Sequence, residues 1–109
     1  AVNVATSTAT TLGNITLAAG TWIVVLSTTF ASNSTGRRAV YFTDSSSVSS
    51  ITVTQLASLA LSPANGAMSK YSSMDIVSPT TQKTYYCRVW QNSGSSLSCQ
   101  CYIRAVRIA

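Results

Sequence analysis

The sequence predicts an all-β sandwich, and three observations support this prediction. Short apolar and β-branched segments alternate along the chain with turns rich in Gly, Ser and Asn. Ser and Thr fill most polar positions, and charged residues make up only 8% of the 109 residues, whereas solvent-facing helices favour Glu, Lys and Gln. No stretch carries the periodicity of an amphipathic helix. We expect one domain over residues 1–109, forming the C-terminal part of a longer protein.

Taken in order, the elements are short strands separated by turn signals. Residues 2–5 form a strand or the tail of a linker. Residues 51–61 could fit a helical turn, but their β-branched first half and the Pro and Gly that follow favour a strand. The expected strands are 2–5, 12–17 (bent at Gly13), 21–30, 37–43, 51–61, 68–77, 84–91 and 97–109.

The strand with the strongest signal is 21–30, which places Trp22, Val24, Leu26 and Phe30 on one face. We expect Trp22 to be a core residue. Arg37 and Arg38 fall on opposite faces of the next strand, so one should be held internally or across an interface while the other reaches solvent.

The last two strands carry large apolar groups on both faces, whereas a strand with one solvent-exposed face should be polar at alternate positions. A small domain has one core, so the second apolar face needs a partner, and a further copy of the chain is the simplest one. The competing interpretations of Tyr86 and Trp90 are scattered surface residues and a sugar-stacking platform. The expected trimer interface consists of Tyr86, Arg88, Trp90, Tyr102, Arg104, Val106 and Ile108.

The net charge of +5 comes from scattered Lys and Arg residues without a basic run or basic helix, which argues against nucleic-acid binding. No apolar stretch is long enough for a membrane helix, so we expect no membrane insertion. The three cysteines, Cys87, Cys99 and Cys101, are expected to be small buried apolar residues, and Cys87 could face either of the others across a strand pair.

The residue inventory argues against enzymatic chemistry. Without His or Glu, no Ser-His-Asp or Cys-His arrangement can form. Asp44 and Asp75 are the only carboxylates, and they could act as a pair only if an assembly brought them together. We expect Asp44 to begin a turn and Asp75 to pair with an Arg or Lys. We therefore predict no enzyme, no cofactor and no metal.

Four segments carry a family resemblance. Residues 17–24 (LAAGTWIV), 30–38 (FASNSTGRR), 89–97 (VWQNSGSSL) and 103–108 (IRAVRI) resemble, in family order, segments of C1q/TNF-like jelly-roll heads, including their bacterial and bacteriophage members. The resemblance implies a trimeric jelly roll of the kind found at the tips of phage tail or head fibres, baseplate proteins and bacterial collagen-like surface proteins. The scarcity of carboxylates departs from the calcium-binding members.

The function that follows is non-enzymatic attachment of a phage or bacterial fibre head to a host cell-surface glycan, at the virion surface or the bacterial exterior, beside other virion or fibre proteins. The alternatives are a purely structural trimerisation cap or virion or exosporium decoration, and a C1q/TNF-like ligand for a protein receptor. Loops 44–50, 64–71 and 78–83 are the expected receptor contacts. Their candidate saccharide-binding residues are Asn65, Lys70, Tyr71, Gln82 and Lys83.

Overall fold

The computed structural model describes residues 2–32, 35–44, 57–61 and 69–109. Within these ranges the chain is all β and contains no helix. The strands are β1 (Val2–Val4), β2 (Thr10–Leu17), β3 (Trp22–Phe30), β4 (Arg38–Thr43), β5 (Ala57–Leu61), β6 (Ser69–Val77), β7 (Lys83–Gln91) and β8 (Leu97–Arg107). Each predicted strand is confirmed in its described part, while residues 51–56 and 68 lie outside the described residues.

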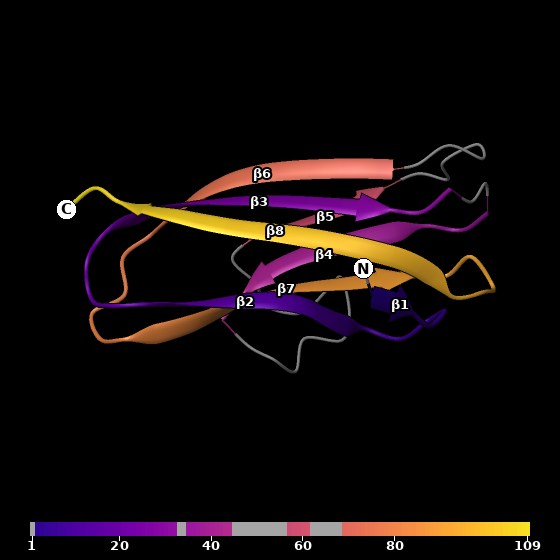
Figure 1. Cartoon of the computed structure of the whole chain (residues 1–109), viewed down its shortest axis with the longest axis horizontal. Coiled ribbons are helices and arrows are strands. Elements are labelled where there is room, and N and C mark those ends of the chain that lie inside the picture. The colour runs from indigo at the N-terminus through magenta and orange to yellow at the C-terminus, as the bar shows by residue number, and fades with distance from the viewer. Residues whose placement is uncertain (1, 33–34, 45–56, 62–68) are drawn as a thin grey trace.

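The strands form two antiparallel four-stranded sheets that face each other (Figure 1), in the orders β1-β8-β3-β6 and β2-β7-β4-β5. The chain is therefore a β-sandwich, elongated to 42 × 22 × 21 Å. The last two strands lie in different sheets, although the turn between them is short. A residue of β7 thus faces β8 across the core rather than across a strand pair, which corrects the expected relation between Cys87 and the other two cysteines.

The predicted bend in the second strand is a β-bulge. The register of β2 on β7 shifts between Thr11 and Gly13, so β2 has one extra residue there. A bulge of this kind bends the strand and increases its local twist. At the far end of the chain, β8 ends two residues earlier than predicted, and the amide groups of Ile108 and Ala109 both donate to the Thr21 carbonyl, at 2.8 and 3.3 Å.

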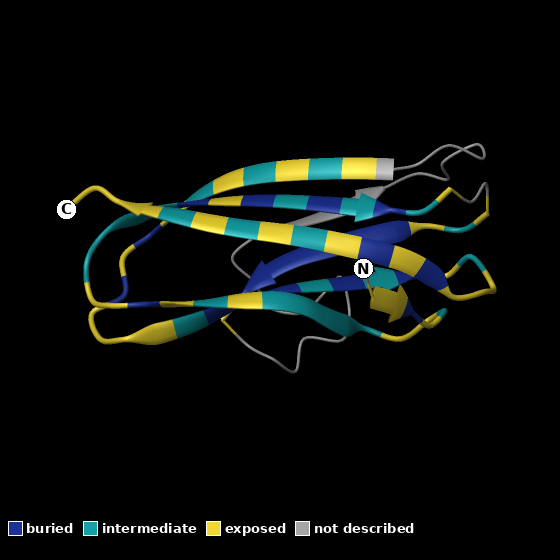
Figure 2. Cartoon of the chain, viewed as in Figure 1, coloured by how far each residue is buried: buried dark blue, intermediate teal, exposed yellow. Residues whose placement is uncertain are grey.

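The core lies between the sheets and follows the predicted alternation. Inward residues such as Val24, Leu26 and Val89 are buried, while their neighbours along each strand are less so, as the striped burial pattern of β8 and β6 shows (Figure 2). Strand β4 differs, because it is buried at every position. Arg38 lies in this buried strand and donates from Nη1 to the Thr35 carbonyl at 2.8 Å, whereas Arg37 is exposed. The predicted division between the two arginines is confirmed.

Trp22 is only partly buried, although it packs against the core as expected. Its indole Nε1 donates to the Ala18 carbonyl at 3.0 Å, and the Arg107 guanidinium lies 5.9 Å from the ring centroid. The ring thus closes the end of the core where β3 begins and β8 ends.

At the opposite end, a buried amide side chain secures the turn between β7 and β8. The side chain of Gln91 is fully buried and donates from Nε2 to the carbonyls of Val4 (2.9 Å) and Ser95 (2.7 Å). Its Oε1 accepts the Ser93 amide at 2.7 Å. Gln91 thus ties the first strand to the last turn, and we call this region, comprising Gly36 and residues 91–96, the Gln91 corner.

A second contact in the Gln91 corner requires glycine. Gly36 has a φ of 77°, and a Cβ atom there would lie 2.5 Å from both oxygens of Asn92. The Arg37 amide donates to Asn92 Oδ1 at 2.5 Å, and the Asn92 amide donates back to the Arg37 carbonyl at 3.2 Å. The loop before β4 and the turn after β7 therefore fit together only because residue 36 has no side chain.

Candidate functional site

A hollow of about 450 Å³ opens at the end of the sandwich away from the Gln91 corner. It is lined by Asp44, the segment 76–83 and Tyr85, and we refer to it as the hollow. Asp44 directly follows β4, while segment 76–83 runs from the end of β6 through a loop into β7. The hollow therefore joins described residues from two of the three loops that the sequence predicts as receptor contacts.

One ion pair spans the hollow. Lys83 Nζ lies 2.9 Å from Asp44 Oδ2, and both side chains are substantially exposed. The hydrogen bond and charge of Asp44 raise the pKa of Lys83, so the lysine stays protonated. An exposed pair contributes little to stability because water and salt screen it. Both groups are therefore available to hydrogen-bond a ligand at small cost to the fold.

The loop beside this pair is held firmly while its side chains stay accessible. The Pro79 carbonyl accepts the Gly20 amide at 3.0 Å, and the hydroxyls of Ser78 and Thr21 lie 3.1 Å apart. Pro79 is buried, whereas Thr80, Thr81 and Gln82 are exposed. The hollow thus offers hydroxyl, amide, ammonium and carboxylate groups on a fixed backbone, which suits recognition of a polyhydroxylated ligand.

The aromatic residue of the hollow does not form a stacking surface. Tyr85 is only 4% exposed, and its ring stacks on Phe42 at 5.5 Å between centroids. Burial raises the pKa of Tyr85. Recognition in the hollow would therefore depend on hydrogen bonds rather than on ring stacking.

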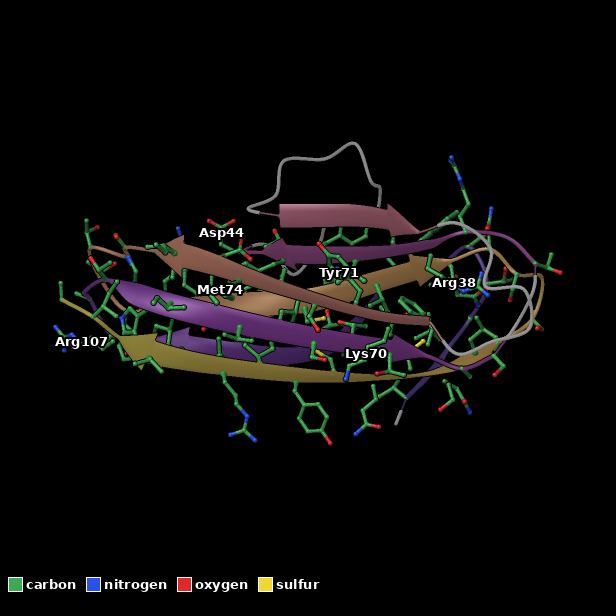
Figure 3. All side chains as sticks on the ribbon, turned by 90° about the horizontal axis from the view of Figure 1, so that it is seen from above. Arg38, Asp44, Lys70, Tyr71, Met74 and Arg107 are labelled. Carbon is green, nitrogen blue, oxygen red and sulfur yellow. The ribbon has the colours of Figure 1, made fainter. Side chains whose placement is uncertain are left out.

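The structure separates the five predicted saccharide-binding residues. Gln82 and Lys83 both line the hollow. Lys70 and Tyr71 lie at the start of β6, toward the other end of the long axis from Asp44 (Figure 3). Lys70 is exposed on the outer face, whereas Tyr71 is partly buried against the core. Asn65 lies outside the described residues.

The structure also divides the seven predicted interface residues. Tyr86, Arg88 and Trp90 project from the outer face of the β2-β7-β4-β5 sheet. Tyr102, Arg104 and Val106 project from the outer face of the other sheet, and Ile108 follows the end of β8. Residues of the first group are half-buried within the chain. Trp90 packs on Ala39 and Tyr41, and Arg88 Nη1 donates to Thr11 Oγ1 at 2.5 Å. These contacts show that much of the first group's surface is used inside the protomer.

One residue of the second group, Val106, belongs to an apolar surface that was not predicted from the sequence. Ile23 pairs in register with both Ile76 and Val106, and Val25 pairs with Met74 and Arg104. Met74, Ile76 and Val106 are 69%, 67% and 65% exposed. We call these five outward residues the apolar face; they are Ile23, Val25, Met74, Ile76 and Val106. The alternation of residues in β6 could have indicated part of the apolar face from the sequence. It places Met74 and Ile76 on the face of the strand opposite to that of Tyr71 and Val77, which point inward.

The two carboxylates have separate environments. Asp44 lines the hollow and pairs with Lys83. Asp75 is half-buried in β6 and accepts a hydrogen bond from Ser73 Oγ at 3.4 Å. Burial raises the pKa of Asp75, and the Ser73 hydrogen bond partly offsets this. The expected Arg or Lys partner of Asp75 is not seen among the described residues.

Comparison with known proteins found no matching family model, no matching curated protein and no matching solved structure. In the part of the chain that the structure describes, no three His, Cys, Asp or Glu side chains gather as a metal site would require. The same residues form no helix of the length and apolarity needed to cross a membrane.

Proposed function

We propose that this chain is a non-enzymatic jelly-roll head domain that assembles as a homotrimer in a fibrous protein of a bacteriophage or bacterium and attaches to a host cell-surface saccharide. The strand order supports the jelly roll, because eight antiparallel strands in two sheets ordered 1-8-3-6 and 2-7-4-5 have the connectivity of a doubled Greek key. The four segments whose sequences resemble C1q/TNF-like jelly-roll heads also support a jelly roll. Such a head would lie at the virion surface or outside the bacterial cell, beside other fibre proteins.

The observation that carries the assembly is the apolar face. The residues of the apolar face are large apolar side chains in neighbouring register positions. Covering such side chains with another surface is favourable, and the free energy gained is roughly 25 cal/mol for each Å² of apolar surface removed from water. Monomeric proteins seldom expose contiguous apolar patches of more than a few hundred Å². In a homotrimer, three copies of this face would cover one another or a neighbouring surface of the next copy.

Light scattering over a range of protein concentrations tests the assembly. We expect a stable mass of three chains, because the apolar face is an integral part of a rigid sheet and needs no rearrangement to pair. A single-chain mass at all concentrations would contradict the trimer. The aromatic residues Tyr86 and Trp90 would then favour a monomeric carbohydrate-binding module.

The hollow supports attachment to a saccharide. We expect the wild-type protein to bind host cells or a glycan array, and the double variant Gln82→Ala, Lys83→Ala to bind at least roughly tenfold more weakly, since a hydrogen bond to a charged group contributes about 1.5–3 kcal/mol. Titration of the captured glycan against both proteins gives the affinity ratio.

Lys70→Ala is the matched control, because it removes the same charge from the end of β6 that lies away from the hollow. Its binding should equal that of the wild type. Equal weakening in both variants would show that net charge, rather than the hollow, attracts the ligand. Absence of any glycan or cell binding by a confirmed trimer would favour the alternative, a structural trimerisation cap or decoration domain.

A further inference from the structure

Two cysteines from opposite sheets meet in the core. Cys87 lies on the inward face of β7 and Cys101 on the inward face of β8. Thr28 sits opposite Cys101 in the pairing of β3 with β8, and its Oγ1 lies 3.6 Å from Cys87 Sγ. Thr28, Cys87 and Cys101 therefore form one cluster in which the two sheets touch.

The two thiols of this cluster differ in access and acidity. Cys87 is fully buried, whereas Cys101 is only partly buried. The interaction between the two thiols lowers the pKa of Cys101, and the same interaction together with burial raises the pKa of Cys87. The third cysteine behaves differently, because burial raises the pKa of Cys99 to about 11. Since the thiolate is the nucleophile, Cys101 is the group that an oxidant would meet first.

We propose that Cys101 and Cys87 form a redox-reactive pair that closes a disulfide between the two sheets when the protein meets a small disulfide oxidant such as oxidised glutathione. The Cys101 thiolate attacks one sulfur of oxidised glutathione, which breaks its S–S bond and releases one glutathione thiolate. Cys87 then attacks the Cys101 sulfur, and the second glutathione leaves as a thiol because its sulfur takes the proton of Cys87. The two cysteines together lose two electrons, and one glutathione disulfide becomes two glutathione thiols.

The bridge would fasten the sandwich through its centre. Immunoglobulin domains show that a disulfide can join the two sheets of a sandwich across the core. A disulfide holds its Cα atoms about 4.4–6.8 Å apart, so closing it would draw β7 and β8 together beside Thr28. Because the bridge restricts the unfolded chain, we expect the thermal midpoint to rise by roughly 10 °C.

Incubation of the reduced protein with oxidised glutathione, followed by intact-mass and peptide analysis, tests the pair. The wild-type mass should fall by two hydrogen atoms. In Cys99→Ala, trypsin leaves one cysteine in peptide 84–88 and one in peptide 89–104, and these two peptides should be recovered cross-linked. In the wild type, fragmentation of peptide 89–104 between Gln100 and Cys101 locates the bond without any substitution.

Two further variants separate the roles of the thiols. Cys87→Ala should retain one glutathione on Cys101, because the resolving thiol is gone, and Cys101→Ala should not react. The proposal would be overturned if peptides 84–88 and 89–104 stayed separate while Cys101 carried glutathione in Cys99→Ala. It would also be overturned if Cys101→Ala reacted as fast as the wild type, or if the bond mapped to Cys99.

Discussion

Replacing Gln91 with leucine should destabilise the domain by about 3 kcal/mol, because it removes three hydrogen bonds to backbone groups at a buried position. The Val4 carbonyl loses the Gln91 donor, the Ser93 amide loses its acceptor, and the Ser95 carbonyl keeps only its hydrogen bond from Ser93 Oγ at 3.0 Å. Leucine nearly fills the same volume, so the loss reports on hydrogen bonding rather than on a cavity. Chemical denaturation at one fixed protein concentration measures the change, since the stability of an oligomer depends on concentration.

The control for this substitution is Gln100→Leu. Gln100 is exposed on the outer face of β8, where its side-chain amide donates to the Tyr102 hydroxyl at 2.9 Å. We expect this variant to remain within about 0.5 kcal/mol of the wild type, as surface substitutions usually do. If Gln91→Leu were equally mild, the Gln91 corner would not be what fixes β1 and the last turn.

Val106→Asp should convert the proposed trimer into single chains without unfolding them. In the isolated protomer the side chain at position 106 is exposed, so a carboxylate there stays hydrated. In the assembly the same carboxylate would be buried against apolar groups without a partner, which costs several kcal/mol in each contact. Light scattering should give a single-chain mass, and the far-ultraviolet circular dichroism should remain that of a β-sheet protein.

Ser98→Asp is the matched control, because Ser98 lies on the same face of the same strand but at its polar end. It adds the same charge outside the apolar face and should leave three chains together. If light scattering still gave a mass of three chains for Val106→Asp, the protomer interface would lie elsewhere, for example on the surface that carries Tyr86 and Trp90.

The division of each strand into an inward and an outward face could be predicted from the sequence. Side chains alternate with a period of two residues, so Leu97, Cys99 and Cys101 had to share a face, and the structure places that face toward the core. Alternation does not say which strand pairs with which. That choice depends on contacts between distant parts of the chain, such as β3 with β8. For this reason the sequence left open a strand pair in which Cys87 would face either Cys99 or Cys101, and the structure shows that this pair does not form.

The candidate sites were less predictable for the same reason. Gln82 and Lys83 were selected for their chemistry within a loop, but their meeting with Asp44 requires the end of β4 to lie beside the start of β7. The apolar face likewise combines residues from three strands. A single strand such as β6 contributes only two residues of the apolar face, and two outward apolar residues in one strand do not by themselves indicate an apolar surface. The surface becomes evident only when the strand register places Ile23 and Val106 beside them.

Two of the resembling segments turn out to be neighbours in space. The glycine of 30–38 packs directly on the asparagine of 89–97, within the Gln91 corner. These residues explain how the turn is built, and none of them lies in the hollow. Their presence therefore reports on the architecture of the domain, whereas segment 78–83, which lines the hollow, lies outside all four resembling segments.

The arrangement of the chain ends has a practical consequence for surface-based binding assays. Residue 2 pairs beside the Gln91 corner, whereas the Ala109 carbonyl accepts the Thr21 amide at 2.9 Å, next to Gly20 and its bond to the Pro79 carbonyl. An affinity tag or biotin fused after Ala109 would begin on the side of the domain where Pro79 lines the hollow, and would crowd a ligand there. An N-terminal tether instead attaches the domain beside the Gln91 corner, at the end away from the hollow.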